Sequence, residues 1–108
     1  MVNYYQNLDG AFSALSHPIR RGILARLAGG EVTVAELAKP YRVSAPAISK
    51  HLRILEKAGL MKRRKRGREH YCRLVPERLQ QAENWIEHYR KFWNERLDNL
   101  ERYLKENK

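Results

Sequence analysis

The chain has 108 residues, of which 43% are hydrophobic and 31% are charged. This length suffices for one domain with a modest core and is too short for two, and the composition is that of a soluble globular protein. No apolar run approaches the roughly 18 residues of a membrane span, and the N-terminus lacks the charged-then-apolar pattern of a signal peptide. We therefore expect a single cytoplasmic domain over residues 1–108, in which the lone cysteine, Cys72, forms no internal disulfide.

The positive charge is concentrated in one part of the chain. The net charge is +10, and eight of the ten excess charges fall within residues 44–74. Net charge alone suits nucleic acid, an anionic membrane or an acidic protein equally well. Because a general solubility charge would be spread along the chain, this concentration favours a phosphate-binding surface.

Two helices are predicted before residue 30. Apolar residues recur at helical spacing over residues 4–15, which indicates a first helix with an apolar stripe. His17 and Pro18 then mark the start of a second helix, and Gly29 and Gly30 mark its end. The residues expected to face inward from this second helix are Ile19, Ile23, Leu24 and Leu27.

Two further helices follow at short spacing. Thr33 and Glu36 have the spacing of a capping box, and Pro40 ends this third helix near Ala38 or Lys39. Ser44 is the expected cap of the fourth helix, where its side chain accepts a hydrogen bond from the N–H of Ala47. Gly59 ends that helix, since glycine adopts the left-handed conformation at little cost. Two short helices joined by a few residues form a helix-turn-helix.

The fourth helix has two different faces. Ile48, Leu52 and Leu55 fall on one side at about 100° per residue, which predicts a core face. The opposite side carries cations and no acid, as expected for a helix in the major groove of DNA. Its residues are Pro46, Lys50, Arg53 and Lys57. The alternative is the solvated face of an ordinary helix, because surface lysines are common.

A basic hairpin is predicted over residues 60–74. Six of the seven residues from Lys62 to Arg68 are basic, and a turn is expected near Gly67. The alternative is a charged, solvated loop. The returning segment 69–74 alternates as a half-buried strand does, which favours a basic loop held out from the domain.

A long amphipathic helix is predicted over about residues 76–106. Leu79, Ile86, Trp93 and Leu100 are seven residues apart, as in a coiled-coil seam. The helix could fold back on its own domain, but a helix of about 40 Å outreaches a body of this size, so we favour a homodimer. The expected interface, shared with the first helix, comprises Tyr5, Leu8, Phe12, Ile86, Tyr89, Trp93, Leu97 and Leu100.

Four segments, in this order, resemble the ArsR family of winged helix-turn-helix transcriptional repressors. They are LSHPIRRGIL at 15–24, TVAEL at 33–37, VSAPAISKHLRILEKAGL at 43–60, and Gly67-Arg68 before Tyr71. The resemblance covers about residues 12–79 and implies a mainly α fold with a small β-hairpin (α+β). It also implies a homodimer paired through its N- and C-terminal helices, whose recognition helices enter successive major grooves of an inverted-repeat operator.

The sequence departs from the metal-sensing members of that family. Their Cys-x-Cys motif corresponds here to Thr33-Val34-Ala35, and the last helix offers only His88 in place of two ligand pairs. One imidazole per chain makes a poor zinc site even across a dimer, so we expect no metal and no cofactor. A metal-responsive or redox-responsive member of the family, acting through His70 and Cys72, remains the alternative.

DNA-binding roles are assigned from residue chemistry. We expect donors to base edges and nearby phosphates from Ser44, Ser49, Lys50 and Arg53, and apolar contacts from Ala45 and Pro46. The hairpin is expected to bind phosphates or a minor groove through Arg64, Lys65, Arg66 and Arg68. His51, at the border of the buried face, is given a packing role first and a phosphate role second.

Two other classes of function are weighed against DNA binding. An enzyme is not expected, since there is no nucleophile with an apparent base, no glycine-rich phosphate loop and no carboxylate pair in an apolar setting. A protein-interaction module docking on an acidic partner is not excluded by charge alone. The effector, the operator and the regulated gene are not encoded in any recognisable pattern.

Overall fold

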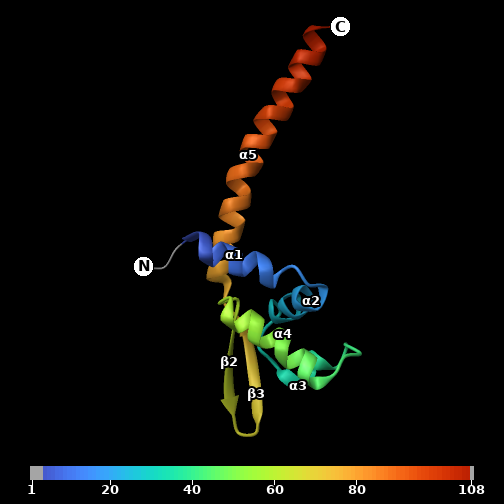
Figure 1. The fold of residues 1–108 in the computed structure, drawn as a ribbon, viewed down its shortest axis with the longest axis vertical. Helices are drawn as coiled ribbons and strands as arrows, with labels where there is room; N and C mark the ends of the chain where they lie inside the picture. Colours follow the sequence, from blue (N-terminus) through green and yellow to red (C-terminus); the bar gives the residue numbers. More distant parts are fainter. Residues whose placement is uncertain (1–3, 108) are drawn as a thin grey trace.

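The structure, a computed structural model, describes the backbone of residues 4–107 and the side chains of residues 8–107. It is mostly helical with a three-stranded antiparallel sheet, which confirms the predicted winged helix-turn-helix architecture (Figure 1). In chain order the elements are α1 Tyr4–Ala14, α2 Pro18–Leu27, β1 Val32–Thr33, α3 Val34–Ala38, α4 Ala45–Lys57, β2 Met61–Arg66, β3 Glu69–Leu74 and α5 Pro76–Glu106.

The core lies between α2, α3, α4 and the sheet. The predicted inner face of α4 is buried, with Ile48 at 2% exposure and Leu52 and Leu55 at 0%. From α2, Ile23, Leu24 and Leu27 are buried, while Ile19 packs against the core with part of its surface exposed. The core side of α4 is therefore fixed by packing, and its opposite side is left for contacts outside the chain.

The strand β1 was not predicted from the sequence. β1 is only two residues long, and Val32 and Thr33 pair with Cys72 and Tyr71 of β3. Two residues are too few to show the alternation by which a strand is recognised. The sheet order is β1-β3-β2, so the hairpin of β2 and β3 is joined to the body through β3.

The predicted helix starts are set by side-chain caps. Ser44 Oγ accepts the N–H of Ala47 at 3.2 Å, which confirms the predicted cap of α4. Thr33 Oγ1 accepts the N–H of Glu36 at 3.2 Å, which is one half of the expected capping box. The Glu36 carboxylate lies 3.8 Å from Arg26 Nη2 and so is turned toward α2. Both caps fix where short helices begin, which positions α4 against the body.

Gly59 ends α4 in the left-handed conformation, with φ of +75°. The N–H of Leu60 donates to the carbonyl of Leu55 at 3.0 Å and that of Gly59 to Glu56 at 3.0 Å, which is the Schellman arrangement. A Cβ at Gly59 would lie 3.1 Å from Nε of Arg78. The chain thus reverses from α4 into the hairpin at a position that suits glycine.

We expect Gly59→Ala to lower the free energy of unfolding by about 1–2 kcal/mol, because alanine is strained at positive φ. Urea unfolding followed by circular dichroism measures this difference. Gly29→Ala is the matched control, since its Cβ would meet only the Arg26 carbonyl at an ordinary 3.5 Å. Equal effects of the two substitutions would contradict the conformational reason given for Gly59.

α5 runs away from the body. Its first turns pack against α1, and beyond them it extends alone, giving the molecule extents of 68 × 37 × 22 Å (Figure 1). It has the predicted bounds, and the alternative that it folds back on its own domain is wrong for this chain. Within residues 4–107, no helix has both the length and the apolar character needed to cross a membrane.

Candidate nucleic-acid interface

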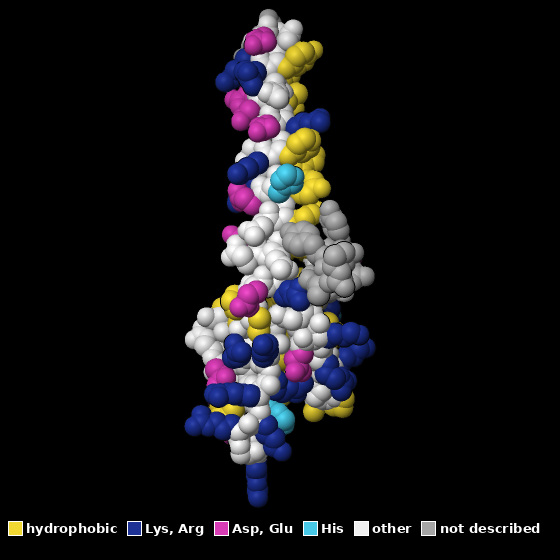
Figure 2. Space-filling model, turned by 90° about the vertical axis from the view of Figure 1, so that its left-hand side faces the viewer, with side chains coloured by type: hydrophobic (Ala, Val, Ile, Leu, Met, Phe, Trp, Pro, Cys, Tyr) yellow, Lys and Arg dark blue, Asp and Glu magenta, His cyan; other side chains and the backbone are white. Residues whose placement is uncertain are grey.

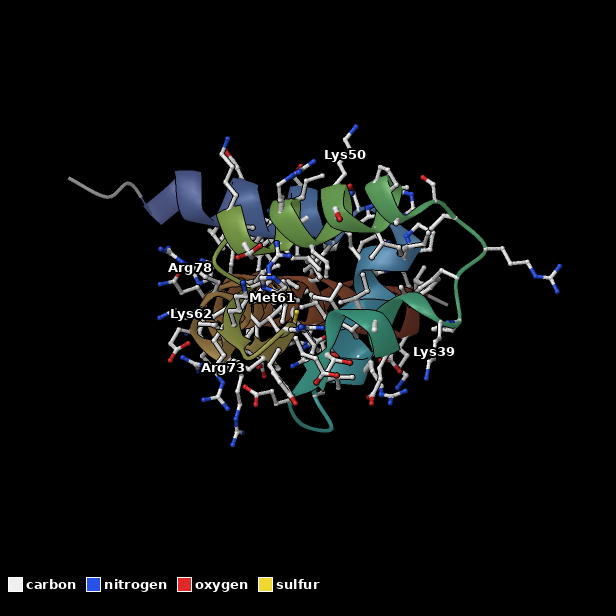
Figure 3. All side chains as sticks on the ribbon, turned by 90° about the horizontal axis from the view of Figure 1, so that it is seen from below. Lys39, Lys50, Met61, Lys62, Arg73 and Arg78 are labelled. Carbon is white, nitrogen blue, oxygen red and sulfur yellow. The ribbon has the colours of Figure 1, made fainter. Side chains whose placement is uncertain are left out.

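The outward face of α4 presents cations that are free of carboxylate partners. Ser44, Ala45, Pro46, Lys50 and Arg53 are exposed. Lys50 points away from the body on the outer side of α4 (Figure 3). Among the side chains of residues 8–107, neither Lys50 nor Arg53 has an ion-pair partner. These charges are therefore available to an anionic ligand.

Ser49 is less accessible than its neighbours. It is half-buried, whereas Lys50 and Arg53 are exposed. Ser44 is already engaged as the cap of α4, because its hydroxyl accepts the Ala47 N–H, although the hydroxyl proton remains a donor. The six predicted residues of this helix thus divide into freely projecting cations and shorter side chains near its beginning.

The hairpin of β2 and β3 projects from the body as a wing (Figure 1). Arg66 pairs with Glu69 across a two-residue loop, in which Gly67 has φ of +66° and no other described residue has positive φ except two further glycines. A two-residue loop with such a glycine in its first position is the arrangement of a type II′ turn. The predicted turn at Gly67 is confirmed, and basic side chains gather at this end of the molecule (Figure 2).

The two faces of the wing carry different cations. Residues paired across the hairpin share a face, so Arg63 and Lys65 lie on the side of Cys72, and Lys62 and Arg64 lie on the side of Tyr71. Lys62 and Arg73, which pair with each other, project away from the side of α4 that carries Lys50 (Figure 3). The wing is therefore basic on both faces.

Arg64 is bound within the chain, unlike the other predicted wing cations. Its Nη2 lies 2.9 Å and its Nε 3.2 Å from the two carboxylate oxygens of Glu31, and this partner raises the pKa of Arg64 further. In the described part of the chain, Lys65, Arg66 and Arg68 have no ion-pair partner. We therefore expect these three to be more available to phosphates than Arg64.

A second ion pair joins the wing to α4, and neither of its residues was among the predicted site residues. Arg63 Nε donates to Glu56 Oε1 at 3.1 Å, and Nη2 donates to the same oxygen. Both side chains are partly buried, at 22% and 34% exposure. The contact joins the root of the wing to the helix beside it, so the two elements keep a fixed relation. No local sequence pattern reveals a contact of this kind between a helix and the strand that follows it.

His51 has the packing role expected of it. It is half-buried, its ring centroid lies 4.4 Å from that of His17, and its Nδ1 lies 3.1 Å from Nη1 of Arg20. Burial is the main cause that lowers the pKa of His51, followed by the nearby His17, Arg20 and Lys50. Arg20 was not among the predicted site residues, because 31 residues separate it from His51 along the chain and no local pattern links the two.

The apolar stripe of α5 is largely uncovered. Its exposed members lie on one side of the helix, with charged side chains opposite (Figure 2). The members predicted for the dimer interface are among them: Ile86 at 49%, Tyr89 at 45%, Trp93 at 60%, Leu97 at 57% and Leu100 at 53% exposure. An exposed apolar strip of this length is typical of an interaction surface.

The residues predicted on α1 contribute less free surface. Leu8 is 3% exposed, so it is already covered within one chain and has almost nothing to offer a second chain. Phe12 is partly buried and packs edge-on against Trp85, with ring centroids 5.5 Å apart. The side chain of Tyr5 lies outside the described residues. The uncovered surface therefore belongs to α5.

Cys72 is a free cysteine and the candidate for nucleophilic chemistry. Cys72 is fully buried in β3, and burial raises the pKa of its thiol, which makes a thiolate nucleophile unfavourable. In the part of the chain that the structure describes, no cluster of three or more His, Cys, Asp or Glu side chains could hold a metal ion. The site that stands out chemically is the cationic face of α4 with the wing.

Comparison with known proteins finds transcriptional regulators with a helix-turn-helix. Residues 15–64 match a family described as a helix-turn-helix domain. The chain is 37% identical over 79 residues to the transcriptional repressor SdpR of Bacillus subtilis, covering 73% of this chain and 88% of SdpR. It is also 37% identical over 96 residues to the HTH-type transcriptional regulator Rv2034 of Mycobacterium tuberculosis, covering 89% of this chain and 87% of that protein.

A solved structure extends the similarity to the whole fold. The crystal structure of the ArsR family transcriptional regulator RHA00566 superposes with a TM-score of 0.80 at 37% identity, over 87% of this chain and 97% of that one. The similarity covers both the helix-turn-helix and most of the chain around it. Transcriptional regulators of this kind are not enzymes, as expected from the sequence. The chain belongs to the ArsR family of winged helix-turn-helix transcriptional repressors.

Proposed function

We propose that this protein is a cytoplasmic repressor that binds an inverted-repeat operator as a homodimer and excludes polymerase from the promoter. The observation that carries the proposal is the outward face of α4. Lys50 points away from the body there (Figure 3), and both Lys50 and Arg53 are exposed without carboxylate partners among the described side chains. An exposed helix face with unpaired cations and short polar residues suits the major groove, where side chains contact base edges.

Within α4 the roles divide by position. Lys50 and Arg53 donate to base edges or adjacent phosphates, and Arg53 is assigned to base reading because its planar guanidinium matches the two acceptors of guanine. Ser44 and Ser49 add shorter-range donors near the beginning of the helix. Ala45 and Pro46 provide apolar contacts to thymine methyl groups.

The wing supplies affinity more than sequence choice. Lys65, Arg66 and Arg68 lie at or near the exposed tip and bind phosphates or enter the minor groove. Arg64 joins them only by giving up its ion pair with Glu31, so its contribution to DNA binding is smaller.

We expect the double substitution of Lys65 and Arg66 by alanine to flatten the salt dependence of operator binding. Loss of four phosphate contacts per dimer reduces the slope of log K against log salt by about 3–4, at about 0.9 per contact. Fluorescence anisotropy between low and moderate salt measures the slope. Lys91→Ala with Lys105→Ala removes the same charge from α5 and should leave it unchanged. An unchanged slope in the wing variant would remove the wing from the phosphate contacts.

The dimer is formed through α5. The exposed stripe from Ile86 to Leu100 supports this assignment, and a second copy of the same stripe is self-complementary, as a two-fold interface requires. Residues 75–108 carry seven basic and seven acidic side chains, so two copies do not repel each other through net charge. Pairing of α5 helices displays α4 twice, which matches the two half-sites of an inverted repeat.

The rival is a protein-interaction module whose basic surface docks on an acidic partner. Retention of fragmented genomic DNA by the immobilised protein at physiological salt, with excess non-specific competitor, separates the two. Repeated recovery of a small set of promoter fragments is the expected result, because specific binding exceeds non-specific binding by about 10³-fold or more. Uniform retention, or none, would contradict the proposed function.

A further inference from the structure

Arg20 is a buried cation at the junction of three helices. It lies on α2 at 9% exposure and, among the described side chains, has no carboxylate partner. Its Nε donates to the carbonyl of Ala14 at 2.7 Å, and its Nη2 donates to the carbonyl of Ser13 at 3.2 Å. These are the last residues of α1, and such terminal carbonyls carry the negative end of the helix dipole. The end of α1 therefore stabilises the buried charge.

The same guanidinium reaches α4. Nη1 of Arg20 lies 3.1 Å from Nδ1 of His51. A guanidinium has donors only, so Nδ1 must accept, and the imidazole must be neutral with its proton on Nε2. A weaker contact of 3.4 Å joins Nη2 to Ser16 Oγ in the connection between α1 and α2. One side chain thus joins the end of α1 to the middle of α4.

The surroundings of His51 favour its neutral form. α2 and the residue before it contribute Arg20 and the ring of His17, whose Nδ1 accepts the Ile19 N–H at 3.1 Å. α4 itself contributes Lys50, and α1 contributes the carbonyls of Ser13 and Ala14, which face Arg20. No carboxylate is among the charged groups that act on His51. A second proton on His51 would therefore face cations.

We propose that Arg20 is a positioning residue for DNA recognition, which holds α4 in its DNA-reading orientation through His51 and links that orientation to α1. The inference rests on the proposed function, since it assigns Lys50 and Arg53, which flank His51 on α4, to the operator. α1 packs against α5, so the connection runs from the dimerisation helix through α1 and Arg20 to the recognition helix. A shift of α1 is transmitted to Lys50 and Arg53 by hydrogen bonds.

The hydrogen bond from Arg20 to His51 is the joint between α2 and α4, and protonation of His51 breaks it. Nδ1 then carries a proton and becomes a donor facing a donor, and two positive charges oppose each other. The ordinary pKa of histidine is about 6.5, and that of His51 is lowered, so the joint is intact at pH 8 and is lost as the pH falls below about 6.5. A side chain that merely filled space would have no such dependence.

The test compares operator affinity of the wild-type protein, His51→Gln and Arg20→Met from pH 8.0 to 5.5 at constant ionic strength. His51→Gln, whose amide oxygen accepts from Arg20 and does not titrate, should lose about threefold at pH 8. The wild-type protein should lose about threefold more than His51→Gln between pH 8.0 and 5.5, because the pKa of His51 lies below 6.5 and only part of the histidine gains a second proton by pH 5.5. Arg20→Met should bind the operator weakly at every pH, and its affinity should not show the additional loss at low pH. His88→Gln is the control: it removes a histidine from α5 and should show the same additional loss of affinity at low pH as the wild-type protein.

Two results would overturn the proposal. Parallel pH profiles of the wild-type protein and His51→Gln would show that the joint does not act on DNA binding. If Arg20→Met lost operator affinity between pH 8.0 and 5.5 as strongly as the wild-type protein, Arg20 would not be the residue that disfavours protonation of His51. Thermal unfolding of each variant establishes that the protein measured is folded.

A second measurement uses the wild-type protein alone and holds even if a variant does not fold. Nitrogen-15 NMR of the histidine side chains should find His51 unprotonated at Nδ1 and protonated at Nε2, with a pKa below 6.5. A proton on Nδ1, or a pKa of 6.5 or above, would overturn the joint. Failure of the wild-type protein to bind any DNA selectively at pH 8 would contradict the proposed function, whereas the NMR result would still decide the contact of Arg20 with His51.

Discussion

Replacement of Trp93 and Leu97 by glutamate is expected to convert the dimer into a monomer and to weaken operator binding by at least a hundredfold. In one chain these side chains are 60% and 57% exposed, so the substitutions cost the isolated subunit little. In the proposed dimer they lie at the centre of the α5 pairing, where four carboxylates would be buried without partners. Loss of the second half-site contact makes the effect on DNA binding large, because a hundredfold corresponds to about 2.7 kcal/mol.

Sedimentation velocity gives the oligomeric state, and a gel-shift titration gives the operator affinity. Asn84→Glu with Lys91→Glu is the matched control, since it places two carboxylates on the exposed side of the same helix that lies opposite the stripe. Circular dichroism establishes that both variants keep α5. A doubly substituted protein that remained a dimer with full affinity would show that α5 is not the interface.

Arg53→Ala is expected to weaken binding to the best operator by about 5-fold to 150-fold, equivalent to about 1–3 kcal/mol, and to relax the choice at one base pair in each half-site. The reason is that a bidentate contact from arginine to guanine is lost while the phosphate contacts of the wing remain. Affinities for a set of single-base operator variants measure the effect. Binding to sequences already changed at that position should hardly alter.

Lys57→Ala serves as the control for Arg53→Ala. It removes one cation from the same side of α4, but from the last turn of the helix, and we assign this lysine to phosphates and not to base edges. This variant should weaken all operator variants by a similar factor. If Arg53→Ala also weakened every sequence equally, its assignment to base reading would be wrong.

The parts of the fold that depend on local chemistry were predictable. Ser44 and Gly59 set the ends of α4 through hydrogen bonds within a few residues, and Pro46 favours the helix start through its fixed φ. Gly67 sets the turn of the wing. The inward face of α4 follows from helical spacing alone. For this reason the helix-turn-helix, the hairpin and the length of α5 could all be predicted from the residues.

The contacts between distant residues could not be predicted. Glu31 holds Arg64 from 33 residues away, and Arg20 holds His51 from 31 residues away. Charge patterns identify cations but not which of them are already paired. Of the four wing cations predicted to be free, Arg64 is therefore already paired. Arg20 has a role that its position in α2 did not indicate.

Amphipathic spacing also leaves the identity of the covering surface open. The stripe of α1 predicted Leu8 at an interface between chains, whereas Leu8 is buried within its own chain. The stripe of α5 predicted the same kind of interface, and there the side chains are exposed. Periodicity gives the direction of an apolar face, and only the three-dimensional arrangement tells whether the chain itself covers it.

Selection of bound sites from random duplex DNA is the most direct test of a dimer that presents α4 twice. The expected result is a motif of two inverted half-sites whose centres are about 10–10.5 base pairs, or a multiple of one helical turn, apart. Arg53→Ala should recover the same spacing with reduced preference at one position in each half. Recovery of a single isolated half-site, or of no enriched sequence at all, would contradict the paired recognition helices.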